Sequence, residues 1–460
     1  MVIKKLLIAN RGEIAVRIIR AAKELGLQTV VVHSTADANS LAVEMADETV
    51  EIGPASAAKS YLNVEAVLNA ARQTGADGVH PGYGFLAENA DFADAVEAAG
   101  MIFVGPSGAM IRKMGDKASA RKAAEEAGVP TVPGSDGILN DMKMAQLVAM
   151  DIGYPVMIKA TAGGGGRGIR IAESAEEFVS LARLASEEAK LAFGDGGLYL
   201  EKLIDAARHI EVQIMGDGGN FVHCYERECS LQRRRQKVWE EAPSSSLSAT
   251  VREKLCSSAV ALAKSVGYRG AGTVEYLYDD KTGDYYFIEM NTRIQVEHTI
   301  TEEITGIDLV AEMICIAGGE TLSFCQEDIA IQGHAIEVRI NAEDPMNKFM
   351  PSPGVIGKMR IPGGPGVRFD HMLFEGYKIP TAYDSLLGKL IVHAGTRETA
   401  IFRLKRTVSE LRINGIKTSA PLFLALTENE DIKHGEIHTK WLETWLESNS
   451  DKIRPIADIE

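Results

Sequence analysis

Cysteine, tryptophan and positive charge are all scarce in this 460-residue chain. It has five cysteines and three tryptophans, and 64 Asp and Glu residues outnumber 49 Lys and Arg, for a formal net charge of −15. Such sparse cysteines exclude a disulfide scaffold and favour a reducing compartment. The excess of negative charge excludes an extended nucleic-acid surface, which needs cationic faces.

Long hydrophobic runs are missing as well. The apolar run near the N-terminus, Leu6 to Ala9, is shorter than the roughly 7–15 residues of a signal-peptide core. No run reaches the ~18 apolar residues of a membrane span. We therefore expect a cytoplasmic protein without a membrane partner. Hydrophobic residues at 45% and charged residues at 25% are ordinary for folded domains.

The patterning divides the chain into three domains and a tail. The expected parts are residues 1–113, 114–330, 331–446 and 447–460. The first alternates short apolar runs with amphipathic helical patterns, which predicts a Rossmann-like parallel sheet covered by helices. The second contains a small hairpin-and-helix lid at about 136–202, followed by a strand-rich body. The pattern of the third domain predicts mostly short strands with one clear helix at 400–411. The tail lacks periodicity and is expected to fray.

A glycine-rich loop, Gly163 to Gly168, fits the pattern G-x-G-x-x-G only formally. A dinucleotide-binding loop opens a helix, whereas the residues after this loop alternate like a strand. The sequence contains no P-loop pattern either. What remains is a glycine hairpin whose amides are free to fold over phosphates as a flap, and the alternative is a mobile surface loop. Lys159, which ends the preceding strand, favours the flap.

Two aromatic-rich strands, 272–278 and 285–291, flank a glycine-containing turn and predict a β-hairpin. With a three-residue loop, Glu275 falls directly opposite Glu289. Two carboxylates in that position repel each other unless something cationic lies between them, and Asn291 projects from the same face as Glu289. Two carboxylates and an amide oxygen suit Mg²⁺; a solvated polar face is the alternative.

Further polar residues extend this pattern. Arg293, Gln295 and Glu297 follow at the same spacing, and the alternation of acid, amide and cation is typical of a reaction site. The segment 227–237 is a short cationic patch in an acidic chain. Its brevity and the lack of interleaved aromatic residues argue against nucleic acid and favour an anion site for phosphate and a small anionic substrate.

These segments together resemble the biotin carboxylase family, a branch of the ATP-grasp enzymes. The matching motifs follow the family's order over nearly the whole chain and are Ile8–Ala15, His80–Asn89, Met114–Lys117, Lys159 with the glycine loop, Glu228–Arg234, Glu289–His298, Arg339–Pro345 and Tyr383–Ser385. The resemblance implies an α/β fold, α+β overall. The implied architecture is an ATP-grasp domain together with an N-terminal Rossmann-like domain, a small lid subdomain and a strand-rich C-terminal domain.

The resemblance also implies a reaction. ATP and bicarbonate give carboxyphosphate, which carboxylates biotin on a separate biotin carboxyl carrier protein, with Mg²⁺ or Mn²⁺ as the metal. This is the first half-reaction of acetyl-CoA carboxylase in fatty acid synthesis. Carboxyltransferase subunits are then further partners, and we expect a homodimer.

Roles for individual residues follow from the same resemblance. The implied ATP contacts are Lys117, Lys159, Gly165, Gly166, Glu201, Lys202, Leu203, Ile204, His209, Gln232, Glu275 and Glu289. The implied metal ligands are Glu275, Glu289 and Asn291. Bicarbonate and biotin would contact Lys237, Arg293, Gln295, Val296, Glu297 and Arg339. Among these, Lys237, Arg293, Glu297 and Arg339 are the catalytic set, in which Glu297 deprotonates bicarbonate and Arg339 stabilises the enolate oxygen of biotin.

The chain departs from the family pattern at three positions. Arg235 stands where His is frequent, Thr299 where Pro commonly follows the Glu-His pair, and Pro365 where some relatives place an aromatic at the dimer interface. The triplet around Lys143 mimics the biotin attachment site of carrier domains. However, a helical pattern follows it and the sequence contains no carrier domain, so we expect no biotin there.

Other functions stay open at this stage. The enzyme could belong to a pyruvate or propionyl-CoA carboxylase complex, or be another ATP-grasp carbon–nitrogen ligase. A nicotinamide dehydrogenase lacks its glycine fingerprint here. A catalytically silent homologue conflicts with the presence of every expected catalytic side chain.

Overall fold

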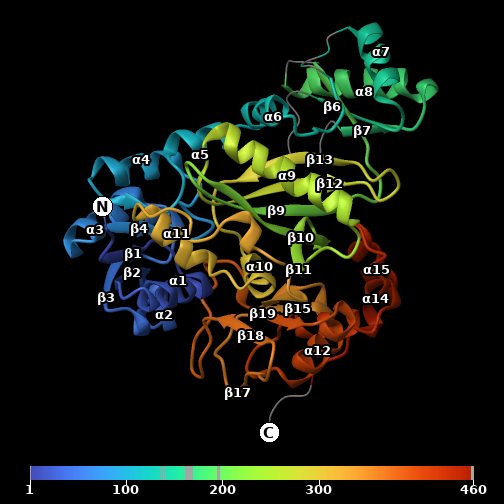
Figure 1. Cartoon of the computed structure of the whole chain (residues 1–460). Helices are drawn as coiled ribbons and strands as arrows, with labels where there is room; N and C mark the ends of the chain where they lie inside the picture. The colour runs from blue at the N-terminus through green and yellow to red at the C-terminus, as the bar shows by residue number, and fades with distance from the viewer. Residues whose placement is uncertain are drawn as a thin grey trace.

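The computed structural model describes residues 2–456 apart from 136, 138, 140, 161–168 and 194–196. A Rossmann-like unit, a projecting lid and a large antiparallel sheet make up the molecule (Figure 1). None of the helices in these described ranges has the length and apolar character needed to cross a bilayer.

The N-terminal unit is a five-stranded parallel sheet of order β3-β2-β1-β4-β5. Its strands are β1 (Lys5–Ile8), β2 (Gln28–Ser34), β3 (Glu48–Gly53), β4 (Gly78–His80) and β5 (Ile102–Phe103). Its helices are α1 (Gly12–Glu24), α2 (Leu41–Met45), α3 (Val64–Thr74), α4 (Ala90–Ala98) and α5 (Gly108–Gly115). Leu6 and Ile8 pack with α1 in one core and Leu7 packs with α3 and α4 in another, so both faces are covered. The predicted Rossmann-like unit is confirmed.

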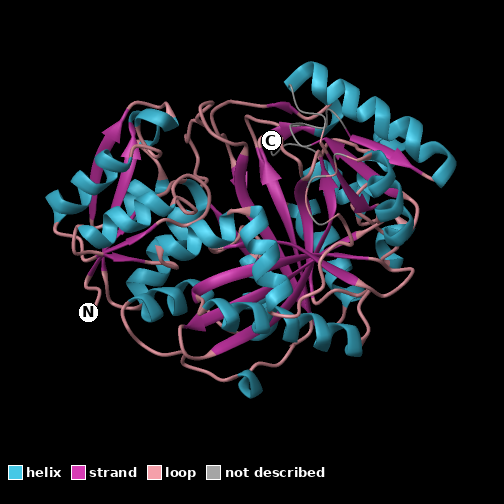
Figure 2. Ribbon diagram, turned by 90° about the horizontal axis from the view of Figure 1, so that it is seen from above, coloured by secondary structure: helices cyan, strands magenta, loops and turns pink. Residues whose placement is uncertain are grey.

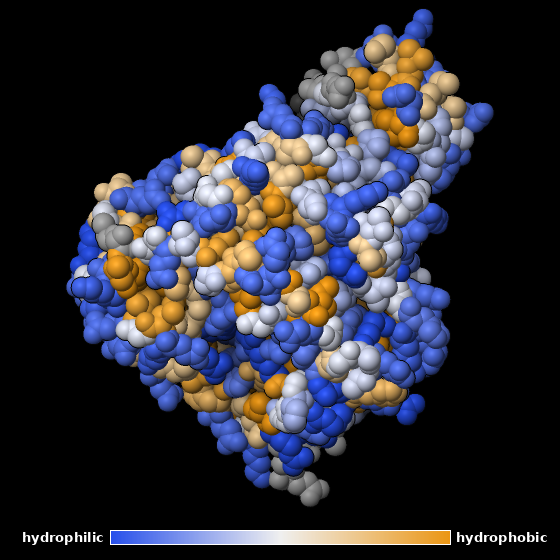
Figure 3. Space-filling view, viewed as in Figure 1, coloured by the Kyte–Doolittle hydropathy of each residue, from blue (hydrophilic) through white to orange (hydrophobic). Residues whose placement is uncertain are grey.

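The lid is a three-stranded antiparallel sheet of order β7-β6-β8 with helices packed on it. Its elements, after α6 (Lys117–Glu126), are α7 (Met142–Ile152), β6 (Val156–Ala160), β7 (Ile169–Ala172), α8 (Ala175–Phe193) and β8 (Leu198–Lys202). It has its own hydrophobic core around Ile158 and Phe178 and projects from the body (Figure 1). Met144, Leu147 and Met150 of α7 are more than half exposed, and apolar surface is visible on the lid (Figure 3). Lys143 lies in the first turn of α7 and not on a hairpin tip.

The body is built on one eight-stranded sheet of order β13-β12-β9-β10-β11-β14-β19-β18, antiparallel throughout. The strands are β9 (Arg208–Asp217), β10 (Phe221–Arg233), β11 (Gln236–Ala242), β12 (Arg269–Tyr278), β13 (Tyr285–Asn291), β14 (His334–Asn341), β18 (Val367–His371) and β19 (Leu386–Ala394). Its strands fan through the centre of the molecule with helices along them (Figure 2). Because β11 pairs with β14, the sheet runs without a break across the expected boundary at residue 330.

Helices cover this sheet, and two-residue strands complete the C-terminal region. The helices are α9 (Ala249–Val266), α10 (His298–Thr305), α11 (Leu309–Ala317), α12 (Arg397–Glu410), α13 (Ala420–Leu426), α14 (Glu430–His434) and α15 (Trp441–Asn449). The short strands are β15 (Glu343–Asp344), β16 (Met350–Pro351), β17 (Met359–Arg360) and β20 (Arg412–Ile413). The helix α9 begins at the cap Ser248, whose side chain accepts from Val251 N, and ends at Gly267 with φ +63°.

The C-terminal region is more helical than the sequence pattern predicted. Only α12 was expected, whereas α13 to α15 are also present because their few apolar residues pack into one core with β14 and β19. The tail is also more ordered than expected, since α15 continues to Asn449 and Ile453 is 4% exposed against the same core.

Candidate active site

A pocket of about 630 Å³ opens on one face of the large sheet. It brings together residues that the sequence analysis singled out, namely His209, Gln232, Lys237, Glu275, Glu289, Asn291, Arg293, Gln295, Val296, Glu297 and Arg339. They come from β9 to β14 and from the loop before α10. The strand-to-strand register therefore sets their relative positions.

The hairpin of β12 and β13 places Glu275 directly opposite Glu289, as predicted. The turn differs from the prediction: Asp279 donates its backbone N–H to Asp284 O at 2.9 Å, so the loop is one residue longer. A β-bulge leaves Ile288 as an extra residue on β13 and returns the two glutamates to the predicted pairing.

The acids of this hairpin continue a row across the sheet. Glu275 also pairs in register with Glu211 of β9, and Glu211 pairs with Arg227 of β10. Arg227 is fully buried, and its Nε lies 2.6 Å from Glu211 Oε1. The row of three acids thus ends on a buried cation at one side and on Glu289 at the other.

Lys237, on β11, lies at the centre of the charge network. Its Nζ is 2.5 Å from Glu211 Oε2, 2.7 Å from Glu297 Oε1 and 3.0 Å from Glu275 Oε1. It also donates to Gln295 Oε1 at 3.2 Å. Burial alone would lower the pKa of Lys237, but the carboxylates around it raise the pKa well above its ordinary value. Lys237 therefore stays charged.

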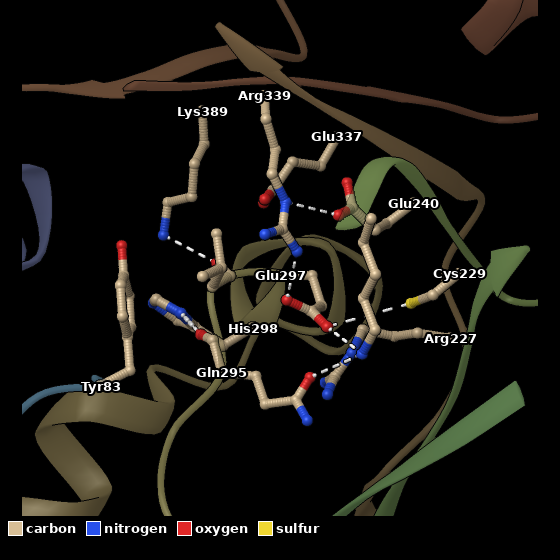
Figure 4. A network of polar contacts seen from close by, with 12 residues as sticks. Tyr83, Arg227, Cys229, Glu240, Gln295, Glu297, His298, Glu337, Arg339 and Lys389 are labelled. Carbon is tan, nitrogen blue, oxygen red and sulfur yellow. Dashed lines mark hydrogen bonds and ion pairs between the residues drawn. The ribbon is translucent and has the colours of Figure 1, made fainter. Parts of the chain in front are cut away.

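Glu297 is held between two cations. Its Oε1 faces Lys237, and its Oε2 lies 3.0 Å from Arg339 Nη2 (Figure 4). Burial alone would raise the pKa of Glu297, but Lys237, Arg339 and Arg227 outweigh it and hold the pKa below its ordinary range. An ionised carboxylate therefore faces the pocket beside two fixed positive charges.

The residues after β13 reach the pocket from a loop and not from a continued strand. The strand ends at Asn291, and Glu297 is the residue immediately before α10. Arg293 is fixed at both ends, because its Nε lies 2.8 Å from Glu88 Oε2 and its Nη2 donates to Asn291 Oδ1 at 2.9 Å. The Val296 carbonyl accepts from Lys389 Nζ at 2.8 Å. Arg293, Gln295 and Glu297 therefore line the pocket from the exit of the strand.

Comparison with known proteins shows the family to which the chain belongs. The chain is 54% identical over 444 residues to biotin carboxylase 1 of Bacillus subtilis, covering 96% of this chain and 99% of that protein. Family models for the biotin carboxylase N-terminal domain, the carbamoyl-phosphate synthase L chain ATP binding domain and the biotin carboxylase C-terminal domain match residues 2–111, 116–325 and 337–444. The chain belongs to the biotin carboxylase family. The expected enzyme class, an ATP-dependent carboxylating ligase, is confirmed with it.

The chain is also similar to components of pyruvate carboxylase and 2-oxoglutarate carboxylase. A pyruvate carboxylase subunit of Methanothermobacter thermautotrophicus is 48% identical over 454 residues, covering 98% of this chain and 92% of that protein. The biotin carboxylase domain dimer of Hydrogenobacter thermophilus 2-oxoglutarate carboxylase, solved with MgADP, ADP and bicarbonate, aligns with a TM-score of 0.86 at 48% identity and covers 99% of this chain and 100% of that chain. These matches confirm the predicted ATP-grasp fold class.

The carboxylates of the hairpin fit a divalent metal. Burial and repulsion from Glu275 raise the pKa of Glu289, and the Glu289 carboxylate makes no hydrogen bond or ion pair with any described residue. An uncompensated carboxylate facing a second one suits a hard cation with oxygen ligands. Asn291 instead donates its Nδ2 to Glu275 Oε1 at 2.9 Å, so its amide would have to turn to offer an oxygen.

The nucleotide-side residues expected on the lid lie apart from this pocket. Lys159 of β6 and Glu201 of β8 form an ion pair across neighbouring strands. Lys202 ends β8, and residues 203–204 follow it, outside the lining of the pocket. Gly165 and Gly166 lie outside the described residues.

Lys117 connects α6 to the hairpin. It is the first residue of that helix, after the cap Asp116. Its charge acts to lower the pKa of Glu289, against the larger effects of burial and Glu275. The predicted phosphate-binding lysine therefore lies within electrostatic range of the proposed metal ligands.

Several residues of the network received no role from the sequence. They are Tyr83, Glu88, Glu211 and Glu240. Arg227 was assigned to the predicted anion patch, but it is fully buried and paired with Glu211. One signal was available, because Glu211 follows His209 at the two-residue spacing that puts both on one face of β9. The other contacts join residues far apart in the chain, and local patterning does not report them.

Proposed function

We propose that this protein carboxylates biotin on a separate carrier protein, using ATP, bicarbonate and Mg²⁺, as the biotin carboxylase component of acetyl-CoA carboxylase. The observation that carries the proposal is Glu297 fixed between Lys237 and Arg339 in a pocket that also holds Glu275 and Glu289. The nucleotide, magnesium and bicarbonate bound to the structural relative support the ligand set.

Bicarbonate would bind where Glu297 meets its two cations. Lys237, Arg293 and the Val296 amide offer positive charge and N–H donors to a small anion. An anion that takes over the Lys237 and Arg339 contacts removes what lowers the pKa of Glu297, so the carboxylate becomes a stronger base as the substrate binds. Glu297 then accepts the bicarbonate proton, and the bicarbonate oxygen that loses it attacks the γ-phosphorus of ATP, whose bond to the β–γ bridging oxygen breaks as ADP leaves.

Glu275, Glu289 and Asn291 would hold the metal, which neutralises charge on the phosphates when bound. Lys117 and Lys159, with the loop at Gly165 and Gly166, would position the triphosphate. Glu201, Lys202, Leu203 and Ile204 would surround the adenine, with His209 and Gln232 on the nucleotide side. The carboxyphosphate formed must be kept from water, and the Arg339 guanidinium, together with Gln295, would hold the biotin ureido group.

Bicarbonate-dependent ADP release tests the reaction. Free biotin should stimulate it, and the carboxylated product should carry label from ¹⁴C-bicarbonate. ATP cleavage that needs no bicarbonate, or label that enters another acceptor, would reject biotin carboxylation.

The choice of complex is tested separately. The 54% identity to a biotin carboxylase supports the acetyl-CoA carboxylase assignment, while the pyruvate carboxylase relative supports a keto-acid carboxylase as the second candidate. Affinity purification of the native complex, followed by assays with acetyl-CoA, propionyl-CoA and pyruvate, decides between them. The biotinylated chain and the carboxyltransferase should both be recovered.

A homodimer belongs to the same proposal. Arg17 contacts Glu302 and Asp308, and Arg368 contacts Glu302 and Asp370, so a charged face joins α1, α10 and β18. The dimeric relative supports the assembly. Sedimentation should give twice the mass of the chain, and Arg17→Glu should shift it toward the monomer; a monomeric wild type would reject the dimer.

A further inference from the structure

Two buried glutamates behind Arg339 have no part in the roles above. Glu240 of β11 and Glu337 of β14 face each other directly in the antiparallel register, and both are fully buried. Both lie beside Arg339 (Figure 4). Arg339 donates from Nε to Glu240 Oε1 at 2.7 Å, while its Nη2 reaches Glu297. Glu240 therefore binds the Arg339 guanidinium at a second nitrogen, and Glu337 acts on the same guanidinium through its charge.

The hydrogen bonding of this pair is incomplete without a proton. Glu240 Oε2 and Glu337 Oε1 are both buried without a hydrogen-bond partner, and Glu337 Oε2 already accepts from Thr299 Oγ1. Two ionised carboxylates in adjacent buried positions repel each other, and an unpartnered buried oxygen is costly. If the pair binds one proton, one glutamate becomes a neutral hydrogen-bond donor and the other remains a carboxylate that accepts.

The charges around the pair do not replace that proton. Lys389 of β19 acts to lower the pKa of Glu337 more strongly than Arg339 does, but its Nζ bonds Val296 O at 2.8 Å and lies 3.3 Å from Glu13 Oε1, so it gives Glu337 no hydrogen bond. The other titratable or charged groups that face the pair or its partners from the packed elements are Arg227, Cys229, Lys237, Glu297 and His298. Lys237 and Arg227 are committed to Glu211 and Glu297, and burial lowers the pKa of His298 so that it is neutral.

The ionisation behaviour agrees with this geometry. Burial raises the pKa of Glu240 to about 7 even though Arg339 acts to lower it. Burial also raises the pKa of Glu337 well above its ordinary value; Lys389 acts to lower it, and the charge of Glu240 acts to raise it.

We propose that Glu240 and Glu337 form a positioning pair that shares one proton and fixes the Arg339 guanidinium for the anionic acceptor. With one proton, the pair carries a single negative charge, and Arg339 keeps positive charge available to the ureido oxygen. Loss of the proton adds a second negative charge, which draws the guanidinium toward the pair and competes with the substrate. This inference rests on the proposed role of Arg339.

The Thr299 hydroxyl fixes the orientation of the pair. Its hydrogen bond to Glu337 Oε2 leaves Oε1 as the oxygen free to share the proton with Glu240. Thr299 is one of the positions where the chain departs from the family pattern, and this contact gives the departure a structural consequence.

Single and double glutamine variants test the shared proton. In Glu337→Gln or Glu240→Gln, the amide supplies a permanent donor to the remaining carboxylate and keeps the single negative charge. We expect biotin-dependent turnover within about threefold of wild type at neutral pH in each single variant, and the wild-type decline at alkaline pH should disappear. The double variant E240Q/E337Q removes the charge that holds Arg339 and should lower kcat/KM for biotin about 100-fold, with KM for ATP unchanged.

Infrared spectroscopy detects the shared proton directly, and its signal would not change if the two glutamates had only a structural role. Wild-type protein should show the band of a buried protonated carboxylic acid, and Glu337→Gln should lose it. Thr407→Val is the matched control, because Thr407 is buried on α12 and its hydroxyl has no partner; its spectrum and kinetics should match the wild type. Absence of the band, or single variants as impaired as the double, would overturn the shared proton.

Arg339→Gln distinguishes the proposed role of Arg339 from the proposed role of the positioning pair. If it leaves biotin-dependent turnover intact, the proposed role of Arg339 fails. If it lowers turnover about 100-fold while the double variant behaves as wild type, only the positioning pair fails. Bicarbonate-dependent ATP cleavage without biotin reports in each variant whether the rest of the site is folded.

Discussion

Replacing Glu297 by glutamine removes the proposed base and leaves its shape and most of its contacts. The substituted side chain still offers an oxygen to Lys237 or Arg339, but its amide N–H₂ faces the other cation. Bicarbonate then keeps its proton in the ternary complex. We expect ATP to bind as before and carboxyphosphate formation to be lost.

The size of each effect follows from the contacts. Loss of general-base proton transfer costs about 10²–10⁴-fold in kcat. The stability loss is smaller, because Lys237 keeps Glu211 and Glu275 as partners and Arg339 keeps Glu240. Only the charge-assisted hydrogen bonds to Glu297 are lost, and this loss should lower the free energy of unfolding by about 1–3 kcal/mol.

The assay is bicarbonate-dependent ADP release, run beside urea denaturation and ATP titration. Glu226→Gln is the matched control, because Glu226 is an equally buried glutamate that lies 2.7 Å from an arginine, Arg252, outside the pocket. It should lose comparable stability and keep its turnover. Wild-type turnover in Glu297→Gln would refute the base, and equal losses of turnover in both variants would attribute the defect to folding.

Three further expectations concern the metal, the pH response and the lid. Glu289→Gln should remove its repulsion with Glu275 and raise the melting temperature of the ligand-free protein, yet abolish turnover at any Mg²⁺ concentration; unchanged turnover would reject it as a ligand. Burial lowers the pKa of His80 from 6.5 to about 3. Between pH 6.5 and pH 3 the folded state therefore binds fewer protons than the unfolded state. The free energy of unfolding falls as the pH falls below 6.5. Urea titrations at pH 7 and 5 should show this fall, and His80→Gln should reduce it. Glu201→Gln keeps the backbone groups that would contact the adenine and frees Lys159 from a partly exposed ion pair worth up to about 1 kcal/mol, so calorimetry should find ATP bound up to about fivefold more tightly; weaker binding would contradict a phosphate role for Lys159.

The catalytic hairpin shows what a sequence can predict about a site. The alternation around Glu275 and Glu289 placed the two acids opposite each other, and the structure agrees. The assumed loop was one residue too short, and the bulge at Ile288 compensated for that error. The pairing of the acids survived because the strand pattern constrains it, whereas the turn and the bulge depend on backbone geometry that residue types indicate only weakly.

The rest of the network was beyond local patterning. Glu240 contacts Arg339 from 99 positions away in the chain, and Lys389 contacts Val296 from 93 positions away. The first pair forms because β11 and β14 are neighbours in one sheet, and the second joins β19 of that sheet to the loop before α10. The resemblance to a family supplied the roles of Lys237 and Arg339, but it supplied no partner for either residue. The short helices α13 to α15 were missed for a related reason, since they are stabilised by packing against that sheet and not by a strong pattern of their own.

The same architecture separates the two halves of the proposed chemistry. Glu275, Lys237 and Arg339 lie on strands of one continuous sheet, and Glu297 is tied to two of them, so the bicarbonate and biotin side is in place without the lid. Lys159 lies on a different sheet with a separate core. A change in lid position therefore moves the phosphate contacts without altering the base and its cations. If the pKa of Glu297 responds to the arriving anion as proposed, closure over the nucleotide would be left to a part of the molecule that has its own sheet and core.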